Sequence, residues 1–427
     1  MKVPKPHQLR GRDFIAERGR CALWWVPRRG KTLTTVLGLE KLGAKNVLIV
    51  CPKTVIPVWQ AEFLEREWEG TMVCTGTQKK KLKAVVNTVG PVIVSYESAW
   101  RLPVFRRWDA IVFDESIRLS NKDAKSVICW LDNRHLTDNV ILLSGAPCPE
   151  GYWQMASQMM ICRGSWFNTR DIWEYYREYW SYNPDKYKWE CDDHGHLAEV
   201  RRRMNIVGDV GTLKDIGVMD TKLYSTMPVE MSTAQIKYTT ALAEDASLQL
   251  NVKALKLQMA SNGLAGEGED IYLYDNTKNL AVVAYLTDKL ADEPGYQAIV
   301  LCRFVKQVEY LAAMLKAGMI HGGTSDKDRL TATGRFQQGL DKFIVCQVKT
   351  VKMGIDLSAA SQIHYVSNSW SGDDRIQSQE RATNLNKTEP VEIIDWCAHG
   401  VEYMIAAAVK EKKDFSGRLM MKFKFKN

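Results

Sequence analysis

The chain has 427 residues, of which 45% are hydrophobic and 25% are charged, and its formal net charge is +8 at pH 7. This length exceeds what a single hydrophobic core usually serves, and it predicts two domains of roughly 200 residues each. No segment approaches the roughly 20 apolar residues of a membrane-spanning helix. Residues 1–7 are charged and proline-containing, unlike a signal peptide, so we expect a soluble, cytoplasmic protein.

The ten cysteines agree with a reducing compartment, because they are scattered through apolar runs and form no Cys-x-x-Cys pair. They are expected to be small core residues. The positive charge favours a polyanionic partner, although many basic proteins simply carry solvated lysines. The densest basic runs are 79–83 and 410–426, and the first is expected to be a solvated loop or helix start rather than a phosphate contact.

The first part of the chain alternates apolar strands with helical stretches. Continuous aliphatic runs of this kind are typical of strands buried on both faces of a parallel sheet. The expected strands are 47–51, 92–95, 110–113 and 140–144. Residues 1–150 therefore predict an α/β lobe.

The middle of the chain, residues 151–270, is expected to be a helical insertion and an inter-lobe linker region. Its aromatic segment, 153–189, could stack on bases, but packing within the insertion is favoured. A helix is expected over 233–260, and the glycines of 261–269 predict a mobile loop. Strands are then expected at 298–302, 343–346 and 362–366, so residues 271–427 predict a second α/β lobe.

Two short motifs in the first lobe contain candidate catalytic residues. Gly30-Lys31-Thr32 follows the apolar run 22–25, and the strand at 110–113 ends on Asp114-Glu115. In P-loop NTPases such a lysine holds the β- and γ-phosphates, the Thr reaches Mg²⁺, and the Asp of a second strand completes the metal's shell. The ordered pair therefore predicts a nucleoside triphosphate hydrolase.

The phosphate loop is reduced, because Trp25 stands at the place of its first glycine and Arg28 where a second glycine is often found. Gly30 still lets the backbone approach the phosphates, and the amides of a helix that begins near Lys31 would point at the anion. Taken alone, Gly-Lys-Thr is more often an ordinary turn. The strand before it, the helix after it and the later acid pair favour phosphate binding.

Further segments occur in a recognisable order along both halves. In the first half they are Pro6-His7-Gln8-Leu9, residues 48–53 with Trp59 and Phe63, residues 94–97, residues 114–121 and residues 143–147. In the second half they are residues 300–304, residues 321–325 with Arg329 and Phe336, residues 347–357, residues 377–381 and a last helix over 400–413. This order resembles superfamily-two helicases, most closely the Swi/Snf-type branch of DNA translocases. The resemblance implies two tandem RecA-like lobes, each a mostly parallel sheet with helices on both faces, plus helical insertions.

The resemblance also implies a role for each matching residue. Lys31, Asp114, Glu115 and Arg381 would be catalytic, with Glu115 polarising the attacking water and Arg381 serving as an arginine finger. ATP would contact Gln8, Arg29, Gly30, Lys31, Thr32, Gly354, Asp356 and Gln377, and Thr32 and Asp114 would hold Mg²⁺. Ser144, Gly145 and Ala146 would couple hydrolysis to movement. DNA backbone contacts would come from Lys53, Tyr96, Arg303, Gly322, Lys349 and Thr350.

Some positions depart from the family pattern. Asn384 replaces the second motif VI arginine, so Arg381 or a neighbour must compensate, and Ile117 replaces a histidine that links hydrolysis to the coupling motif. Turnover could be slow. Arg28 and Arg29 either add positive charge near the nucleotide or pack outward. A zinc site from Cys191, His194 and His196, with Cys162, fits no standard finger spacing, and a surface loop is favoured.

These observations together predict an ATP-dependent motor acting on double-stranded DNA, monomeric and without an appended reader domain. A separate protein partner could direct it to its substrate. The compact architecture favours a viral or mobile-element gene. The alternatives are a strand-separating or RNA helicase, and a nucleotide-binding scaffold that hydrolyses little, which Asn384 and Ile117 motivate.

Overall fold

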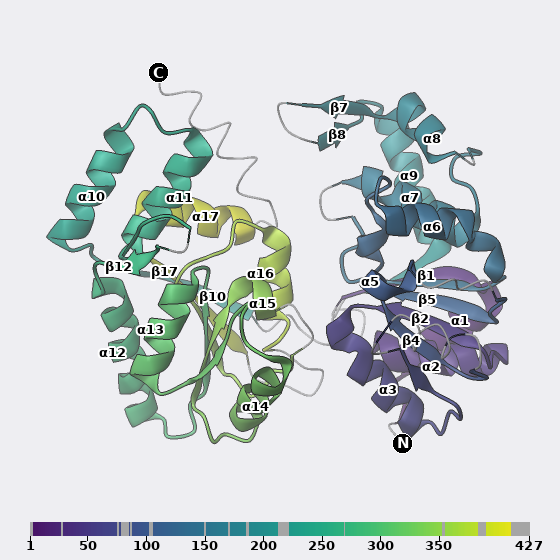
Figure 1. Cartoon of the computed structure of the whole chain (residues 1–427), viewed down its shortest axis with the longest axis horizontal. Helices are drawn as coiled ribbons and strands as arrows, with labels where there is room; N and C mark the ends of the chain where they lie inside the picture. The colour runs from purple at the N-terminus through teal and green to yellow at the C-terminus, as the bar shows by residue number, and fades with distance from the viewer. Residues whose placement is uncertain are drawn as a thin grey trace. The chain divides into compact units, whose positions relative to one another are not determined.

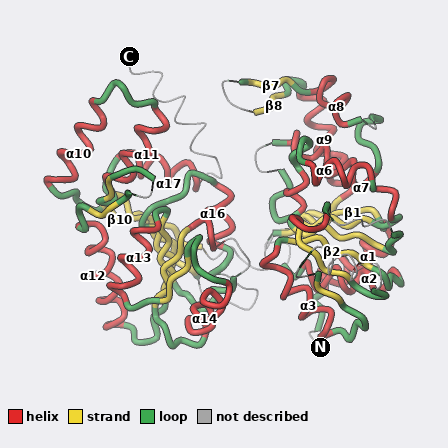
Figure 2. Tube along the Cα trace, viewed as in Figure 1, coloured by secondary structure: helices red, strands yellow, loops and turns green. Residues whose placement is uncertain are grey.

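The computed structural model divides into two compact units, Met1–Met219 and Asp220–Asn427 (Figure 1). The residues that it describes are 3–26, 29–74, 77, 85, 88–101, 106–148, 151–169, 171–184, 188–211, 222–268, 270–351, 355–382 and 390–410. Each unit has a central sheet covered by helices (Figure 2). The predicted α/β class with two RecA-like lobes is confirmed.

The first unit contains a seven-stranded sheet in the order β3-β4-β2-β5-β6-β1-β9. Every pairing within it is parallel. The strands are β1 (Arg20–Trp25), β2 (Val47–Cys51), β3 (Met72–Val73), β4 (Val92–Ser95), β5 (Ala110–Asp114), β6 (Val140–Leu143) and β9 (Gly208–Gly211). Strands β2, β4, β5 and β6 are buried along their whole length, as their continuous apolar runs predict.

Helices cover both faces of this sheet. They are α1 (Pro6–Arg18), α2 (Lys31–Leu42), α3 (Ile56–Glu65), α5 (Tyr96–Ala99), α6 (Lys125–Asp132), α7 (Met155–Arg163), α8 (Ile172–Tyr179) and α9 (His194–Val207), with 3₁₀ turns η1 (Lys53–Val55), η2 (Ser116–Leu119), η3 (Arg134–Leu136) and η4 (Tyr152–Gln154). Helices α1 to α3 pack on one face and α5 to α9 on the other (Figure 1). Because side chains alternate along a strand, Trp24 joins one core and Trp25 the other.

The segment after β6 is more than the helical insertion that its sequence predicts. Between α8 and α9 it forms an antiparallel hairpin of β7 (Ser181–Asn183) and β8 (Lys188–Glu190). Tyr182 and Trp189 face each other across the two strands, with ring centroids 5.5 Å apart, a pairing that stabilises hairpins. Packing of the aromatic segment is confirmed, because Trp166, Tyr175 and Tyr176 belong to the buried core.

The second unit contains a six-stranded parallel sheet in the order β10-β17-β16-β13-β15-β14. Its strands are β10 (Lys222–Pro228), β13 (Ala298–Cys302), β14 (Gly318–Ile320), β15 (Phe343–Gln347), β16 (Gln362–Tyr365) and β17 (Val391–Cys397), and β11 (Leu264–Ala265) and β12 (Tyr272–Leu273) form a separate hairpin. Its helices are α10 (Thr233–Glu244), α11 (Leu250–Ser261), α12 (Thr277–Asp292), α13 (Val305–Leu315), α14 (Asp326–Gln337), α15 (Val348–Val351), α16 (Gly372–Gln379) and α17 (Gly400–Lys410). Helices α12 and α13 cover one face, and α14 to α16 the other.

Two local expectations differ from the structure in the second unit. The single helix expected over 233–260 is wrong, because α10 and α11 are separate. Asp245 ends α10, and its carboxylate accepts bonds from the backbone N–H of Ser247, at 2.9 Å, and from its hydroxyl, at 2.6 Å, a local turn that competes with the helix. The glycine-rich segment that follows contains strand β11.

The boundary between the two units falls inside the segment 151–270. Strand β9 extends the first sheet beside β1, and β10 pairs with β17 in the second. All ten cysteines are free thiols, and seven of them are buried, as their scattered positions predict. Among the described residues, every helix is too short or too polar to cross a bilayer.

Candidate nucleotide and nucleic-acid site

The predicted site residues of the first unit gather at one edge of its sheet. Parallel strands place their carboxyl ends together, and ligands bind outside these ends in open α/β sheets. Gly30 follows β1, Lys53 follows β2, Tyr96 follows β4, Asp114 ends β5 and Ser144 follows β6. Residues more than 100 positions apart in the sequence therefore share this edge.

The phosphate loop has the backbone geometry that its sequence predicts. Gly30 has φ +83°, and a Cβ there would lie 2.1 Å from Nε2 of Gln8, so another residue would be strained and would displace the Gln8 amide. The structure thus places Gln8, on α1, directly against the loop. Lys31 begins α2 and donates from Nζ to the carbonyl oxygens of Trp25 (2.8 Å) and Val26 (3.4 Å). Its ammonium lies against the loop backbone, beside a helix N-terminus suited to an anion.

Arg29 packs into the first unit, so the outward packing considered from the sequence is wrong for this residue. Its side chain is 3% exposed and its guanidinium lies 4.8 Å from the ring centroid of Trp25. A Cβ at Gly211 in β9 would meet the same guanidinium at 1.6 Å. The carbonyl oxygen of Arg29 bonds Nε2 of His7 at 3.0 Å. Arg29 therefore ties the phosphate loop to α1 and β9, and Arg28 lies outside the described residues.

Asp114 is held in one orientation by two neutral donors. The indole N–H of Trp59 donates to Oδ2 at 2.9 Å, and the backbone N–H of Glu115 donates to Oδ1 at 3.0 Å. Burial raises the pKa of Asp114, while the Trp59 bond and the charge of Lys31 oppose this rise. Because that charge acts on the carboxyl group, Lys31 and Asp114 belong to one electrostatic site.

Glu115 has an unusual backbone conformation. Its φ is +53° and its ψ is +56°, and it precedes the 3₁₀ turn η2. The left-handed region is unfavourable for residues other than glycine, and such strain concentrates at functional sites. The turn directs the chain sharply away from β5 immediately after the acid pair.

The sequence did not indicate a buried hydrogen-bonded bridge between the acid pair, Asp114 and Glu115, and the coupling segment, residues 143–147. The hydroxyl of Ser116 donates to Oε1 of Gln158 at 2.9 Å, and Nε2 of Gln158 donates to the carbonyl of Pro147 at 2.8 Å. Both side chains are fully buried. In the coupling segment itself, Ser144 Oγ accepts from the N–H of Ala146 at 3.2 Å, across Gly145. The bridge joins the loop after Asp114 to the loop that contains Pro147. Ile117, the residue that stands in place of the family histidine, is half-buried next to Ser116.

The predicted DNA-binding residues of the first unit differ in their exposure. Lys53, in η1, is exposed. Tyr96 is 6% exposed, and the guanidinium of Arg118 lies 5.6 Å from its ring centroid. Burial and the nearby charge of Asp114 raise the pKa of Tyr96. Lys53 therefore lies at the surface, whereas the Tyr96 ring belongs to the core.

The carboxyl edge of the second sheet carries the remaining nucleic-acid candidates. Gly322 and Lys349 are exposed, whereas Thr350 is buried and donates to the carbonyl of Gln347 at 2.7 Å. Arg303 is half-buried, donates to Oε1 of Gln258 at 2.9 Å and lies 4.4 Å from the Trp370 ring. Burial lowers the pKa of Arg303 to about 10. Its bond to Gln258 fastens α11 to the end of β13.

Two arginines near α16 have different surroundings. Arg375 is 2% exposed, and its guanidinium donates to both carboxylate oxygens of Asp395, at 2.6 and 3.0 Å. Arg381 is half-buried, and its carbonyl accepts from the N–H of Leu357 at 3.0 Å. Arg375 is thus bound to the second sheet, and the finger role of Arg381 stays a prediction.

The other predicted cofactor residues of this unit are partly described. Gln377 is half-buried in α16, and Asp356 is exposed and accepts from the N–H of Ser358 at 3.1 Å. Gly354 and Asn384 lie outside the described residues. Within the described part of the chain, no cluster of three or more His, Cys, Asp or Glu side chains could hold a metal ion. His196 instead stacks on Tyr179, with ring centroids 4.0 Å apart, so the zinc alternative gains no support.

Comparison with protein-family models identifies both halves of the chain. The SNF2-related domain matches residues 28–199, and the helicase conserved C-terminal domain matches residues 278–386. The first range contains Lys31, Asp114 and Glu115, and the second contains Arg381. This chain belongs to the Swi/Snf-type branch of superfamily-two helicases.

Proteins with curated names that are similar to the chain share limited identity with it. A Drosophila melanogaster SWI/SNF-related matrix-associated actin-dependent regulator of chromatin, subfamily A-like protein 1, is 24% identical over 67% of this chain and 38% of its own length. A protein of Acanthamoeba polyphaga mimivirus that carries the name of an ATP-dependent RNA helicase is 22% identical over 85% of this chain and 72% of its own length. The chain thus spans well under half of the Drosophila regulator.

A solved structure also aligns with most of the chain. The SWI2/SNF2 ATPase core of Sulfolobus solfataricus in complex with dsDNA covers 96% of this chain and 91% of its own, with 18% identity and a TM-score of 0.47.

Proposed function

We propose that this SNF2-family chain is a DNA-dependent ATPase that couples ATP hydrolysis to movement along double-stranded DNA. The observation that carries the proposal is the convergence of Gln8, Gly30, Lys31 and Asp114 on the carboxyl edge of one parallel sheet, within a match to the SNF2-related domain. Such an edge is where open α/β sheets bind ligands, and these are the residue types that bind a triphosphate.

Each residue of the first unit has a physical reason for its proposed role. Lys31 would exchange its bonds to the carbonyls of Trp25 and Val26 for phosphate oxygens, which carry full negative charge. Gln8, held beside Gly30, would contact the base. Glu115 would orient the attacking water, and Arg381 of the second unit would stabilise charge on the transferred phosphoryl group.

Magnesium fits the oxygen donors present. Thr32, in the first turn of α2, offers a hydroxyl, and Asp114 a carboxylate whose two oxygens are oriented by Trp59 and Glu115. Mg²⁺ usually takes one or two protein ligands together with waters and substrate phosphates, so a dedicated cluster of acids is not needed. The ion would neutralise charge between the phosphates.

Duplex DNA is the proposed track. The chromatin-regulator name of the Drosophila relative and the net charge of +8 support it. Lys53, Gly322 and Lys349 are exposed, and contacts of this kind bind phosphate without reading sequence. The less exposed candidates would hold the DNA-binding surface in place by packing; they are Arg303, Tyr96 and Thr350. We further propose a monomer that works in the cytoplasm, and a viral or mobile-element origin stays a prediction.

The decisive experiment measures ATP turnover by the full chain with no polymer, duplex DNA, single-stranded DNA or RNA, at low and raised salt. We expect duplex DNA to give the strongest stimulation, which should fall steeply with salt because phosphate contacts release counterions. Displacement of a third DNA strand from a triplex then reports movement. Turnover that no polymer stimulates, in a chain where Lys31→Ala has no effect, would establish the scaffold alternative instead.

An RNA helicase is the second candidate, because the mimivirus relative carries that name and aligns over most of both chains. The same turnover measurement separates the two candidates. Stronger stimulation by RNA than by duplex DNA, together with unwinding of an RNA duplex, would replace the first proposal by the second.

A further inference from the structure

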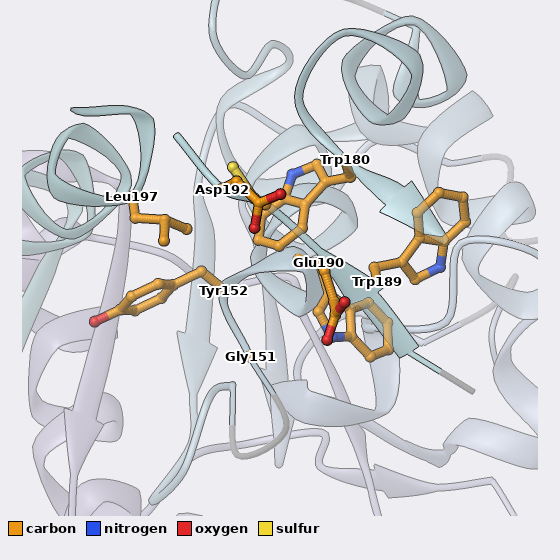
Figure 3. Close-up of a pocket in the computed structure, with 9 residues that line it drawn as sticks. Gly151, Tyr152, Trp180, Trp189, Glu190, Asp192 and Leu197 are labelled. Carbon is orange, nitrogen blue, oxygen red and sulfur yellow. The ribbon is translucent and has the colours of Figure 1, made fainter. Parts of the chain in front are cut away.

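A pocket of about 390 Å³ lies on the insertion of the first unit (Figure 3). It is formed where η4, the end of α8 and the segment from β8 to α9 meet. Its walls include Tyr152, Trp153, Trp180 and Trp189, and its acidic groups are Glu190 and Asp192. This volume lies in the range of ligand-binding pockets.

The lining combines the two features that recognise an organic cation. Indole and phenol rings attract a cation over their faces, and carboxylates add a direct charge interaction. Glu190 is held by a bond from Nδ2 of Asn183 to its Oε2 at 2.8 Å. Figure 3 shows the Glu190 carboxylate between the sides of the pocket that carry Tyr152 and Trp189. Arg201 touches the Tyr152 hydroxyl at 2.9 Å but does not line the pocket.

A lysine of the chain lies in a second group of rings that shares Trp189 with the pocket. Nζ of Lys122 lies 3.6 Å from the ring centroid of Trp173, 5.2 Å from that of Tyr176 and 5.3 Å from that of Trp189. The ammonium also bonds Asp123 at 3.0 Å, although the Lys122 side chain is only 6% exposed. Trp189 belongs both to this cage and to the pocket. The Lys122 cage therefore shows that Trp189, together with other rings and a nearby carboxylate, accommodates an ammonium group.

We propose that this pocket binds a lysine or arginine side chain of a basic segment in a partner protein. Charge complementarity selects this occupant, because Glu190 and Asp192 attract an ammonium or guanidinium group and repel the phosphates of a nucleic acid. The site goes beyond the proposed motor function, because none of its residues belongs to the nucleotide or DNA-binding sets. It supplies a surface through which a partner could direct the motor.

The test uses the full chain and synthetic peptides of equal length that carry four lysines, four arginines, four glutamates or no charge. Isothermal titration calorimetry measures their affinity for the wild type and for the double variant Glu190→Gln/Asp192→Asn. We expect the lysine and arginine peptides to bind, and the double variant to weaken them by about fivefold to tenfold, as loss of two nearby charges implies. DNA-stimulated ATP turnover should be the same in both proteins.

The matched control is Glu174→Gln/Glu178→Gln, which removes the same charge from exposed positions of α8 outside the pocket. Equal weakening in the two double variants would overturn the proposal, because it would show nonspecific attraction. A second variant, Trp189→Leu, should also weaken the basic peptides while the protein stays folded by thermal denaturation. If it weakens a single-stranded oligonucleotide instead and leaves the peptides unaffected, the pocket is a base-stacking surface and the proposal fails.

Discussion

The charged groups at the nucleotide site of the first unit are held differently from two buried ion pairs of the second. In the first, the Lys31 ammonium bonds carbonyl oxygens and the Asp114 carboxylate accepts from an indole and a backbone amide. In the second, Arg375 pairs with Asp395, and Lys278 pairs with Glu402 at 2.6 Å. Neutral partners orient a charge without cancelling it, whereas an opposite charge neutralises it. At the nucleotide site, Lys31 and Asp114 are thus oriented by neutral groups, as a ligand site requires, whereas the second unit uses these two ion pairs to join its elements.

Lys31→Ala should give the largest effect on function and little effect on folding. We expect ATP turnover to fall by at least about 10²-fold, as for loss of a charge that stabilises the transition state, and the free energy of unfolding to change by less than about 1 kcal/mol. Turnover and binding of a fluorescent ATP analogue test this. Lys45→Ala, at an exposed position just after α2, is the control. A large loss of stability with Lys31→Ala would remove the contrast between the units.

Arg375→Leu should have the opposite profile and lower the free energy of unfolding by about 3 kcal/mol. The buried Asp395 carboxylate loses its two-point partner, although it keeps Asn368 at 2.8 Å and Lys410 at 3.2 Å. Urea unfolding, followed in the second unit by a fluorescent label, measures it. Arg335→Leu is the control, because Arg335 also makes a two-point pair, with Asp341, but is 53% exposed. That change should cost less than about 1 kcal/mol. Similar costs at both positions would show that burial does not distinguish the two pairs.

Trp59→Phe should change the orientation of the Asp114 carboxylate while leaving its charge in place. The change removes one hydrogen bond to Asp114 and keeps most of the ring, so we expect a stability cost of about 1.5 kcal/mol. The magnesium concentration for half-maximal binding of the ATP analogue should also rise. Trp68→Phe removes a similar bond, from the indole to Oε1 of Glu40 at 3.0 Å, far from the acid pair in sequence. A magnesium requirement that rises equally in the control would argue against a positioning role.

The sequence predicts the central strands well because they are buried on both faces and therefore read as continuous apolar runs. It does not predict β9, whose residues are Gly208, Asp209, Val210 and Gly211. Those glycines make sense only in three dimensions, since a Cβ at Gly208 would lie 2.5 Å from the Trp24 ring. Local patterns cannot show that a distant indole occupies the space beside a strand.

The site was predictable where contiguous residues carry the chemistry, and less so where partners come from distant segments. Gly30-Lys31-Thr32 and Asp114-Glu115 stand out in the sequence, and Trp59 lies in a segment that resembles the family, but its bond to Asp114 is not visible there. Gln158 lies in α7, whose residues run Met-Ala-Ser-Gln-Met-Met-Ile-Cys-Arg, and belongs to no motif. A buried glutamine among apolar residues was the one feature that could have indicated a polar bridge.

Gln158 gives the finest test, because it joins the acid pair to the coupling segment inside the first unit with neutral groups. A double-mutant cycle of Ser116→Ala and Gln158→Leu should show a coupling energy of about 1 kcal/mol in unfolding. Gln158→Leu should also lower stimulation of turnover by DNA several-fold while basal turnover changes less. Gln307→Leu is the control, since Gln307 is a buried bridge of the second unit, with bonds to Asn262 and Asn279. If that variant lowers stimulation equally, the bridge at Gln158 stabilises the fold without linking hydrolysis to DNA.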